Sequence, residues 1–301
     1  MTFKLFQRPD AKTRKRLWLA YHIGFVLLLA HFLMVHFLPG YSHAVGSDWR
    51  TAFSSPARPP GPEVIERDDG LFLWAGDDPD EHFDITEFRL NPDQLRYGLG
   101  REAFPALIEP EFDSMSTADQ WLEDDHRVLV LRLGDEVRVY PIDLLIRHEI
   151  VNDVVNDIPV FAAYCILADL GAVYDRRIGG RTFTFGLSGH TYSDPEVWDG
   201  MQVFVFWDRE TESLWWPAIG KAVSGLMIDT PLPLVDEKHW SQTNWGEVKS
   251  TYEEAAILQR GQDMERPTDW PKLTQEDLEW DSEKDIARIA PRWGVNAEVS
   301  D

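Results

Sequence analysis

Residues 127–140, RVLVLRLGDEVRVY, decide the fold of this protein. Apolar and charged residues alternate around Gly134-Asp135, and a short glycine-containing pair between two such runs is typical of a β-hairpin turn. We therefore predict two antiparallel strands here. Similar short apolar runs with turn residues between them recur up to about residue 260. The pattern predicts a β-rich α+β domain, built from antiparallel hairpins with a few short helices.

Other segments complete this expectation. The run IPVFAAYC predicts a buried strand at Ile158–Cys165. The turn Gly179-Gly180 predicts a second hairpin, and a polar DRETE turn predicts a third; their strands are Ala172–Ile178 with Arg181–Leu187, and Met201–Trp207 with Ser213–Trp216. Helices are expected at Pro141–Arg147, at Asn244–Glu254 beginning near a Thr243 cap, and at Thr274–Ala290.

The composition excludes several classes of protein. Among 301 residues, 44% are hydrophobic and 12% aromatic, which is enough for a folded core. The single cysteine excludes an intramolecular disulfide, a four-cysteine zinc site and an iron–sulfur cluster. The formal net charge of −23 argues against nucleic acid as a partner, because phosphate binding requires basic surfaces.

The N-terminal region predicts a membrane anchor. Residues 1–16 form a basic tail, and residues 17–38, LWLAYHIGFVLLLAHFLMVHFL, contain no Lys, Arg, Asp or Glu. A helix of that length rises about 33 Å, which is sufficient to cross the hydrocarbon core of a bilayer. The positive-inside rule then places the N-terminus in the cytoplasm and the acidic remainder in the periplasm or outside the cell. A signal peptide cleaved near Ser42-His43-Ala44 is the alternative.

These features divide the chain into five parts. After the cytoplasmic tail and the single-pass inner-membrane anchor, we expect a Pro-rich, acidic tether over residues 39–100. The β-rich globular domain is expected at residues 101–260 and an acidic C-terminal arm at residues 261–301.

Several short motifs carry a family resemblance. They are Phe104-Pro105-Ala106-Leu107, HEIVND at residues 148–153, Tyr164-Cys165, FGLSG at residues 185–189, and Ser213-Leu214-Trp215. In this order, the region of about residues 101–259 resembles the prokaryotic family of domain of unknown function 3179 (DUF3179). The resemblance implies one compact domain and no particular activity. The family pattern has Pro, Leu and often a second cysteine after Cys165, where this chain has Ile166-Leu167-Ala168, so a two-thiolate site cannot operate here.

Cys165 and His148 are the candidate catalytic pair. A thiolate needs a nearby base or cation, and imidazole is the usual one. Because sequential elements are often neighbours, His148 could meet Cys165, with Asp153 or Asn152 orienting the ring. The alternative is an inert Cys165, since cysteine is often buried and AAYCILA is apolar on both sides.

A metal site is the second hypothesis. His148, His190 and Cys165, with Glu149 or Asp194, would suit copper or zinc. The spacing does not match a known metal motif, so a capping or core His148 is the alternative. Other candidate ligand-binding residues are Glu149, Ser188, His190 and Trp216, with a simple turn serine as the alternative for Ser188.

Three functions follow from these observations. The first is a membrane-anchored extracytoplasmic accessory or binding protein with a His/Cys pocket for a ligand or metal. The second is a thiol-dependent enzyme with Cys165 as nucleophile and His148 as base. The third is a structural partner of a membrane protein complex, which would dock through the span and the acidic surface.

Overall fold

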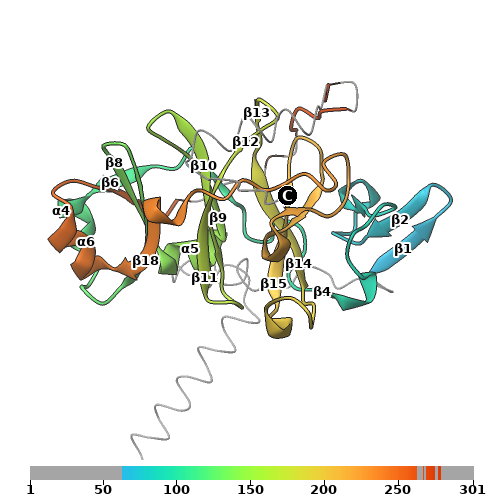
Figure 1. Ribbon diagram of the computed structural model, residues 1–301, viewed down its shortest axis with the longest axis horizontal. Helices are drawn as coiled ribbons and strands as arrows, with labels where there is room; N and C mark the ends of the chain where they lie inside the picture. Colours follow the sequence, from blue (N-terminus) through green and yellow to red (C-terminus); the bar gives the residue numbers. More distant parts are fainter. Residues whose placement is uncertain (1–62, 263–266, 268, 275–276, 279–301) are drawn as a thin grey trace, which may run out of the picture. The chain divides into compact units, whose positions relative to one another are not determined.

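The computed structural model describes residues 63–262, 267, 269–274 and 277–278 (Figure 1). The chain divides into two units, Met1–Ser54 and Ser55–Asp301, and all the described residues belong to the second. The predicted basic tail and membrane span, residues 1–16 and 17–38, lie outside the described residues. From Glu63 onward, no described helix is both long and apolar enough to cross a bilayer.

Four sheets contain most of the strands. The N-terminal sheet has the order β1-β2-β3, and the aromatic sheet has the order β17-β16-β15-β14-β4. The central sheet has the order β11-β10-β9-β5, and the outer sheet has the order β18-β7-β8-β19-β6. Strands β12 and β13 form a separate pair. Two of the strand pairs are parallel, β5 with β9 and β8 with β19, and the others in the described residues are antiparallel.

The strands are short in every sheet. The N-terminal sheet contains β1 (Val64–Arg67), β2 (Gly70–Leu73) and β3 (Phe83–Asp84). The aromatic sheet contains β4 (Leu95–Tyr97), β14 (Phe185–Tyr192), β15 (Val203–Asp208), β16 (Leu214–Trp216) and β17 (Lys221–Ala222). The central sheet contains β5 (Leu107–Ile108), β9 (Ile150–Val155), β10 (Ile158–Cys165) and β11 (Leu170–Asp175). The outer sheet contains β6 (Phe112–Ser114), β7 (Arg127–Leu133), β8 (Glu136–Pro141), β18 (Trp240–Asn244) and β19 (Ala256–Leu258).

Helices are few and short, as the sequence predicts. The α-helices of the described residues are α4 (Met115–Ala118), α5 (Ile142–His148) and α6 (Trp245–Thr251). Single 3-10 turns occur at η1 (Pro79–Glu81), η2 (Pro92–Gln94), η3 (Trp198–Gly200), η4 (Pro217–Ile219) and η5 (Glu237–His239). The cap of α6 is Asn244 and not the predicted Thr243, because the Asn244 side chain accepts from the Glu247 N–H at 2.9 Å.

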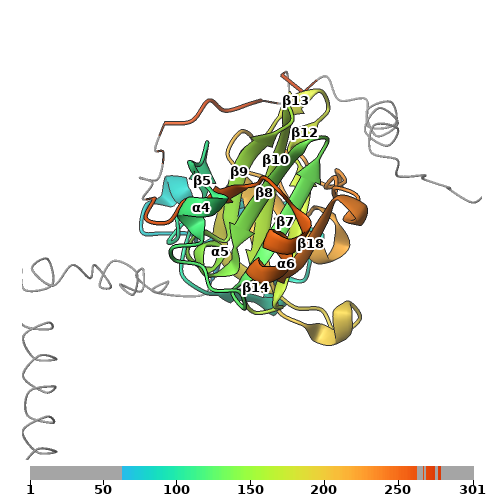
Figure 2. The ribbon, with the colours of Figure 1, turned by 90° about the vertical axis from the view of Figure 1, so that its left-hand side faces the viewer.

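The sheets stack in layers because alternate side chains of a strand point to opposite faces of its sheet, and both faces are apolar. In β7, Leu129 and Leu131 contact the central sheet, whereas Val128 and Val130 pack against α4 and α6. In β10, alternate residues face the outer sheet and the aromatic sheet, which is why IPVFAAYC is apolar throughout. The order of the layers in Figure 1 is α4 and α6, outer sheet, central sheet, aromatic sheet and N-terminal sheet, and Figure 2 views this stack from the side of α4 and α6.

The hairpin predicted around Gly179-Gly180 is only partly correct. Both glycines have positive φ, 59° and 77°, as the turn requires. Only β12 (Arg177–Ile178) and β13 (Arg181–Thr182) pair across it. The longer strands on either side separate into the central and aromatic sheets, because each has a stronger apolar partner there. The turn is therefore a crossing point between two layers.

Residues 63–100 correct the predicted tether. We expected all of residues 39–100 to be an extended linker, but residues 63–97 contain β1 to β4. Leu73 and Phe83 are fully buried, and the Phe83 ring lies 5.7 Å from that of Trp207 on the aromatic sheet. The apolar residues between the acidic ones therefore outweigh the charge density that suggested a tether.

The described part of the predicted C-terminal arm packs on the domain. The Trp270 indole N–H donates to Glu210 Oε1 at 3.0 Å, and the Leu273 N–H donates to the Glu210 carbonyl at 2.6 Å. The helix predicted at Thr274–Ala290 lies almost entirely outside the described residues.

A single amide joins the central and aromatic sheets. Asn152 on β9 is fully buried, and its Nδ2 donates to the carbonyls of Phe185 at 2.9 Å and Leu107 at 3.1 Å. Its Oδ1 accepts from the Phe185 N–H at 2.9 Å. The side chain therefore satisfies backbone groups of β14 and β5 that would otherwise be buried without partners.

We predict that Asn152→Ala lowers the free energy of unfolding by about 3 kcal/mol, because three buried backbone groups lose their partner. Urea unfolding followed by tryptophan fluorescence measures this, with the exposed Gln120→Ala as the matched control. A loss below about 1 kcal/mol would show that the amide is not a structural tie.

Candidate functional site

The end of strand β10 holds the only thiol of the chain. Cys165 is its last residue, is 2% exposed, and belongs to the core cluster between the central and aromatic sheets. Glu149 caps α5 with φ of 54°, and its carbonyl accepts from the Tyr164 N–H at 2.9 Å. The register of β9 with β10 ends at Ile150 opposite Ala163, and Glu149 and His148 directly precede Ile150 at the end of α5. The structure thus brings His148, Glu149 and Cys165 to one end of the central sheet.

The thiol and the carboxyl group at this end are electrostatically linked. Burial raises the pKa of Glu149 from 4.5 to about 7. Burial also raises the pKa of Cys165, and the charge of Glu149 raises it further. Backbone hydrogen bonds from Phe204, Ala168 and Leu167 act in the opposite direction by stabilising the thiolate. At neutral pH the thiol is therefore protonated, and the carboxyl group is close to its midpoint.

His148 is held by the backbone. Its Nδ1 lies 3.0 Å from the carbonyl oxygen of Pro105, so this nitrogen carries the hydrogen. The charged group that acts on the Cys165 thiol is Glu149. The pairing of His148 with Cys165 stays a prediction.

Asp153 and Asn152 are not placed to orient His148. Asp153 lies opposite Val160, five residues before Cys165 along β10, a separation of about 17 Å at the usual strand rise. It accepts from the Tyr140 hydroxyl at 2.8 Å and lies 3.5 Å from Arg138 Nε. The structure therefore assigns Asp153 to a polar contact between the central and outer sheets, and Asn152 to the contact with β14 described above.

His190 and Ser188 belong to another part of β14. His190 pairs with Val205 and is therefore on the face of the aromatic sheet opposite that of Phe204, the residue next to the thiol. It is 1% exposed, and burial lowers its pKa to about 4. Ser188 Oγ donates to the Val205 carbonyl at 2.5 Å and accepts from the His190 N–H at 3.1 Å. These contacts stabilise the register shift within β14, so Ser188 is a buried strand residue and not the turn serine of the alternative.

Trp216 and the cavity lie apart from Cys165. Trp216 is 1% exposed and packs edge-on against Tyr192, with 4.7 Å between the ring centroids. A cavity of about 440 Å³ lies between β5 and the chain after β19. Its lining residues include none of the predicted site residues; they are Leu107, Ile108, Glu109, Glu111, Gln259, Arg260, Gly261 and Gln262.

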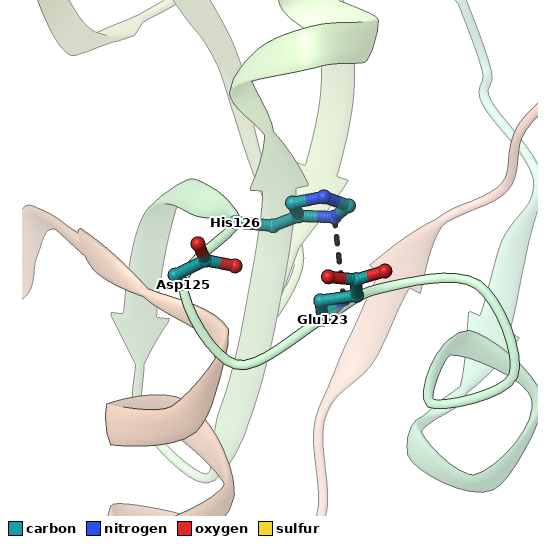
Figure 3. A group of neighbouring side chains, drawn as sticks. All are labelled: Glu123, Asp125 and His126. Carbon is teal, nitrogen blue, oxygen red and sulfur yellow. Dashed lines mark hydrogen bonds between the residues drawn. The ribbon is translucent and has the colours of Figure 1, made fainter. Parts of the chain in front are cut away.

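One cluster of possible metal ligands was not predicted. Glu123, Asp125 and His126 place one ligand atom each within 4.8 Å of one another, in the loop before β7 (Figure 3). The Glu123 N–H donates to His126 Nδ1 at 3.3 Å. The two carboxylates are exposed, and such groups are common without an ion. Within the described residues this is the one group of three such ligands, so His148, His190 and Cys165 do not form a preassembled metal site.

A buried charged cluster around Trp207 was also missed. The Arg101 guanidinium lies 3.7 Å from the centre of the Trp207 ring and forms an ion pair with Glu212 at 2.5 Å. Lys272 binds the same Glu212 carboxylate at 2.7 Å. Beneath them, Arg209 forms an ion pair with Glu102, and both side chains are at most 1% exposed. The sequence signal was the pair Arg101-Glu102 together with Asp208-Arg209, but only the fold shows that they meet.

These layers and the thiol–carboxyl end define a β-rich α+β domain with a largely buried polar site. Residues 101–274 match the family model described as "Protein of unknown function (DUF3179)". The match covers more than half of the chain, and this protein belongs to that family. No curated protein and no solved structure matches the chain.

We predict that Glu149 makes stability depend on pH. Its pKa is about 7 in the folded chain and 4.5 without the fold, so the folded chain binds the extra proton between these values. Its contribution to stability is therefore complete below about pH 4.5 and is lost as the pH rises to 7. Relative to the native chain, Glu149→Gln should gain up to about 3 kcal/mol between pH 4.5 and 7, measured by urea unfolding.

The exposed Glu254→Gln is the control for the change of charge. Parallel pH profiles for Glu149→Gln and the native chain would contradict a raised carboxyl pKa.

Proposed function

We propose that this protein is a membrane-anchored, extracytoplasmic binding protein whose DUF3179 domain binds a soft metal ion at Cys165 and Glu149. The observation that carries this proposal is the pairing of a thiol and a carboxyl group at one largely buried end of a sheet, each with a raised pKa. Two such groups cannot both ionise without a compensating charge. A bound cation supplies that charge.

The donor set fits copper or zinc. Thiolate sulfur suits both ions, and carboxylate oxygen is a usual zinc ligand. Backbone hydrogen bonds from Phe204, Ala168 and Leu167 already favour the thiolate that a metal would need. His148 precedes Glu149 at the end of α5 and would become a third ligand if its ring left the Pro105 carbonyl. His190 is not part of this set.

The anchoring part of the proposal comes from residues 17–38 and the basic tail before them. An uncharged run of that length, preceded by basic residues, favours a single span with the domain outside the cytoplasm. A docking role in a membrane complex is compatible with the same anchor, but it would use neither the Cys165 thiol nor the Glu149 carboxyl group.

We predict that the full-length chain binds about one equivalent of Cu(I) or Zn²⁺, and that Cys165→Ala abolishes this binding. Glu149→Gln should weaken it at least tenfold, since one negative charge is lost. Affinity should increase as the pH rises from 6 to 8, because the metal displaces protons. Anaerobic titration followed by elemental analysis measures all three effects.

His190→Ala is the matched control and should retain the metal if it folds. Full metal content in Cys165→Ala would exclude the thiol as a ligand and overturn the proposal.

A thiol-dependent enzyme remains a second candidate, with one specific observation in its favour. Glu149 has a pKa of about 7, which suits a general base acting on the Cys165 thiol at neutral pH. In this version the base is Glu149, whereas the sequence suggested His148.

The rate at which iodoacetamide alkylates Cys165 distinguishes the metal-binding protein from the thiol-dependent enzyme. The 2% exposure and raised pKa of Cys165 predict that the thiol of the native chain reacts at least a hundredfold more slowly than in urea. Rapid alkylation of the native chain that slows in Glu149→Gln would instead favour the enzyme.

A further inference from the structure

Two turns expose large apolar side chains to solvent. In the turn between β10 and β11, Ile166 is 50% exposed and Leu167 is 55% exposed, and Leu170 at the start of β11 is 40% exposed. In the turn between β14 and β15, Trp198 is 45% exposed and Met201 is 44% exposed. We call these five residues the apolar end.

The two turns lie at the same end of the domain. Cys165, the residue before the first turn, accepts a backbone hydrogen bond from Phe204, the second residue of β15. The end of β10 and the start of β15 are therefore adjacent. Figure 1 shows both turns along its lower edge, and η3 is again at the lower edge in Figure 2.

The backbone holds Trp198 in an unusual conformation. Its φ is 49° and that of Asp199 is 53°, a region that bulky side chains rarely adopt. Backbone hydrogen bonds fix the turn, from Gly200 to the Val197 carbonyl at 3.1 Å and from Met201 to the Trp198 carbonyl at 3.0 Å. Such strain persists only where the surroundings enforce it, and it is concentrated at functional positions. Here it accompanies a tryptophan directed into water.

The charged residues within the two turns are all acidic, and Arg127 of β7 pairs with one of them. Residues 193–202 contain Asp194, Glu196 and Asp199 with no Lys or Arg, and Asp169 lies in the other turn. Asp169 is paired with Arg127 at 2.7 Å. Anionic lipid headgroups repel these acidic side chains. Zwitterionic headgroups do not, because their ammonium groups lie at the same depth as the acidic side chains.

The length of chain before the domain makes a membrane the natural occupant. Only residues 39–62 separate the predicted span from the first described residue, Glu63. A chain of that length extends at most about 80 Å, so the domain stays near the bilayer. A folded domain of this size has a radius of gyration of about 16 Å, so its apolar end can reach the surface.

We propose that the apolar end inserts into a zwitterionic lipid surface, with Trp198 at the headgroup level and Leu167 and Met201 below it. Tryptophan is enriched at membrane interfaces, and aliphatic side chains enter the acyl region. The proposal rests on the membrane anchoring given under the proposed function.

The test uses the full-length chain in liposomes of phosphatidylcholine and phosphatidylethanolamine. In a Cys165→Ser background, Leu167→Cys and Met201→Cys each carry an environment-sensitive fluorophore. Leu226→Cys is the matched control, because Leu226 is 40% exposed and adjoins Met227, whose N–H binds Ser213 Oγ beyond the far end of β15. Brominated lipids then quench only the probes that contact acyl chains.

Quenching at positions 167 and 201 should exceed that at position 226 at least threefold. Replacing half of the lipid with phosphatidylglycerol should reduce it at least twofold, and so should Trp198→Ser. Unfolding midpoints equal to that of the parent chain show that each variant is folded.

Equal quenching at all three positions would overturn the proposal. So would a blue shift without lipid quenching that rises with protein concentration, since that result indicates a second copy of the chain on the apolar end. Flotation of the chain with the liposomes is measured separately. A chain that does not float contradicts the anchoring itself, whereas a chain that floats without quenching contradicts only the insertion.

Discussion

The structure depends on the side-chain amide of Asn152, which acts as a strand partner between two sheets. It binds the backbone of Phe185 on one side and of Leu107 on the other, with no exposure to solvent. This fixes the distance between the central and aromatic sheets, so that the ring of Phe161 fits 4.4 Å from that of Phe185. The same spacing brings the end of β10 against β15 and thereby buries Cys165 beside Phe204. An apolar residue at position 152 would leave these backbone groups unsatisfied at the centre of the molecule.

The thiol–carboxyl end shows how burial changes the roles of ordinary groups. A surface glutamate next to a cysteine would be ionised and of little consequence. Here, burial moves the pKa of Glu149 to about 7 and raises that of Cys165, so that protons occupy sites that a cation can take. The backbone hydrogen bonds to the sulfur keep the opposite, ionised state accessible. At neutral pH the thiol is therefore protonated and the carboxyl group is partly protonated, which is the state that the proposed metal would displace.

The sequence predicted the local elements better than their partners. The hairpin at residues 127–140, the strand at Ile158–Cys165 and the short helix before His148 are confirmed, because alternation, turn residues and apolar runs act locally. The hairpin at Gly179-Gly180 was extended too far, since pairing between β11 and β14 is decided by the layers on either side. For the candidate site, the order of sequential elements predicted that His148 lies near Cys165, and this stays a prediction. The importance of Glu149 was not predicted, because its raised pKa comes from burial by residues distant in sequence.

The shared carboxylate of Glu212 has a consequence for how this unit can be reused in larger proteins. Arg101 opens the region that defines the family, Lys272 stands two residues before its end, and both contact that carboxylate. Entry and exit of the polypeptide are therefore close together. A module with adjoining ends can be spliced into a surface loop of an unrelated host without separating the flanking strands, and joining its ends by a short linker would allow new termini to be opened elsewhere.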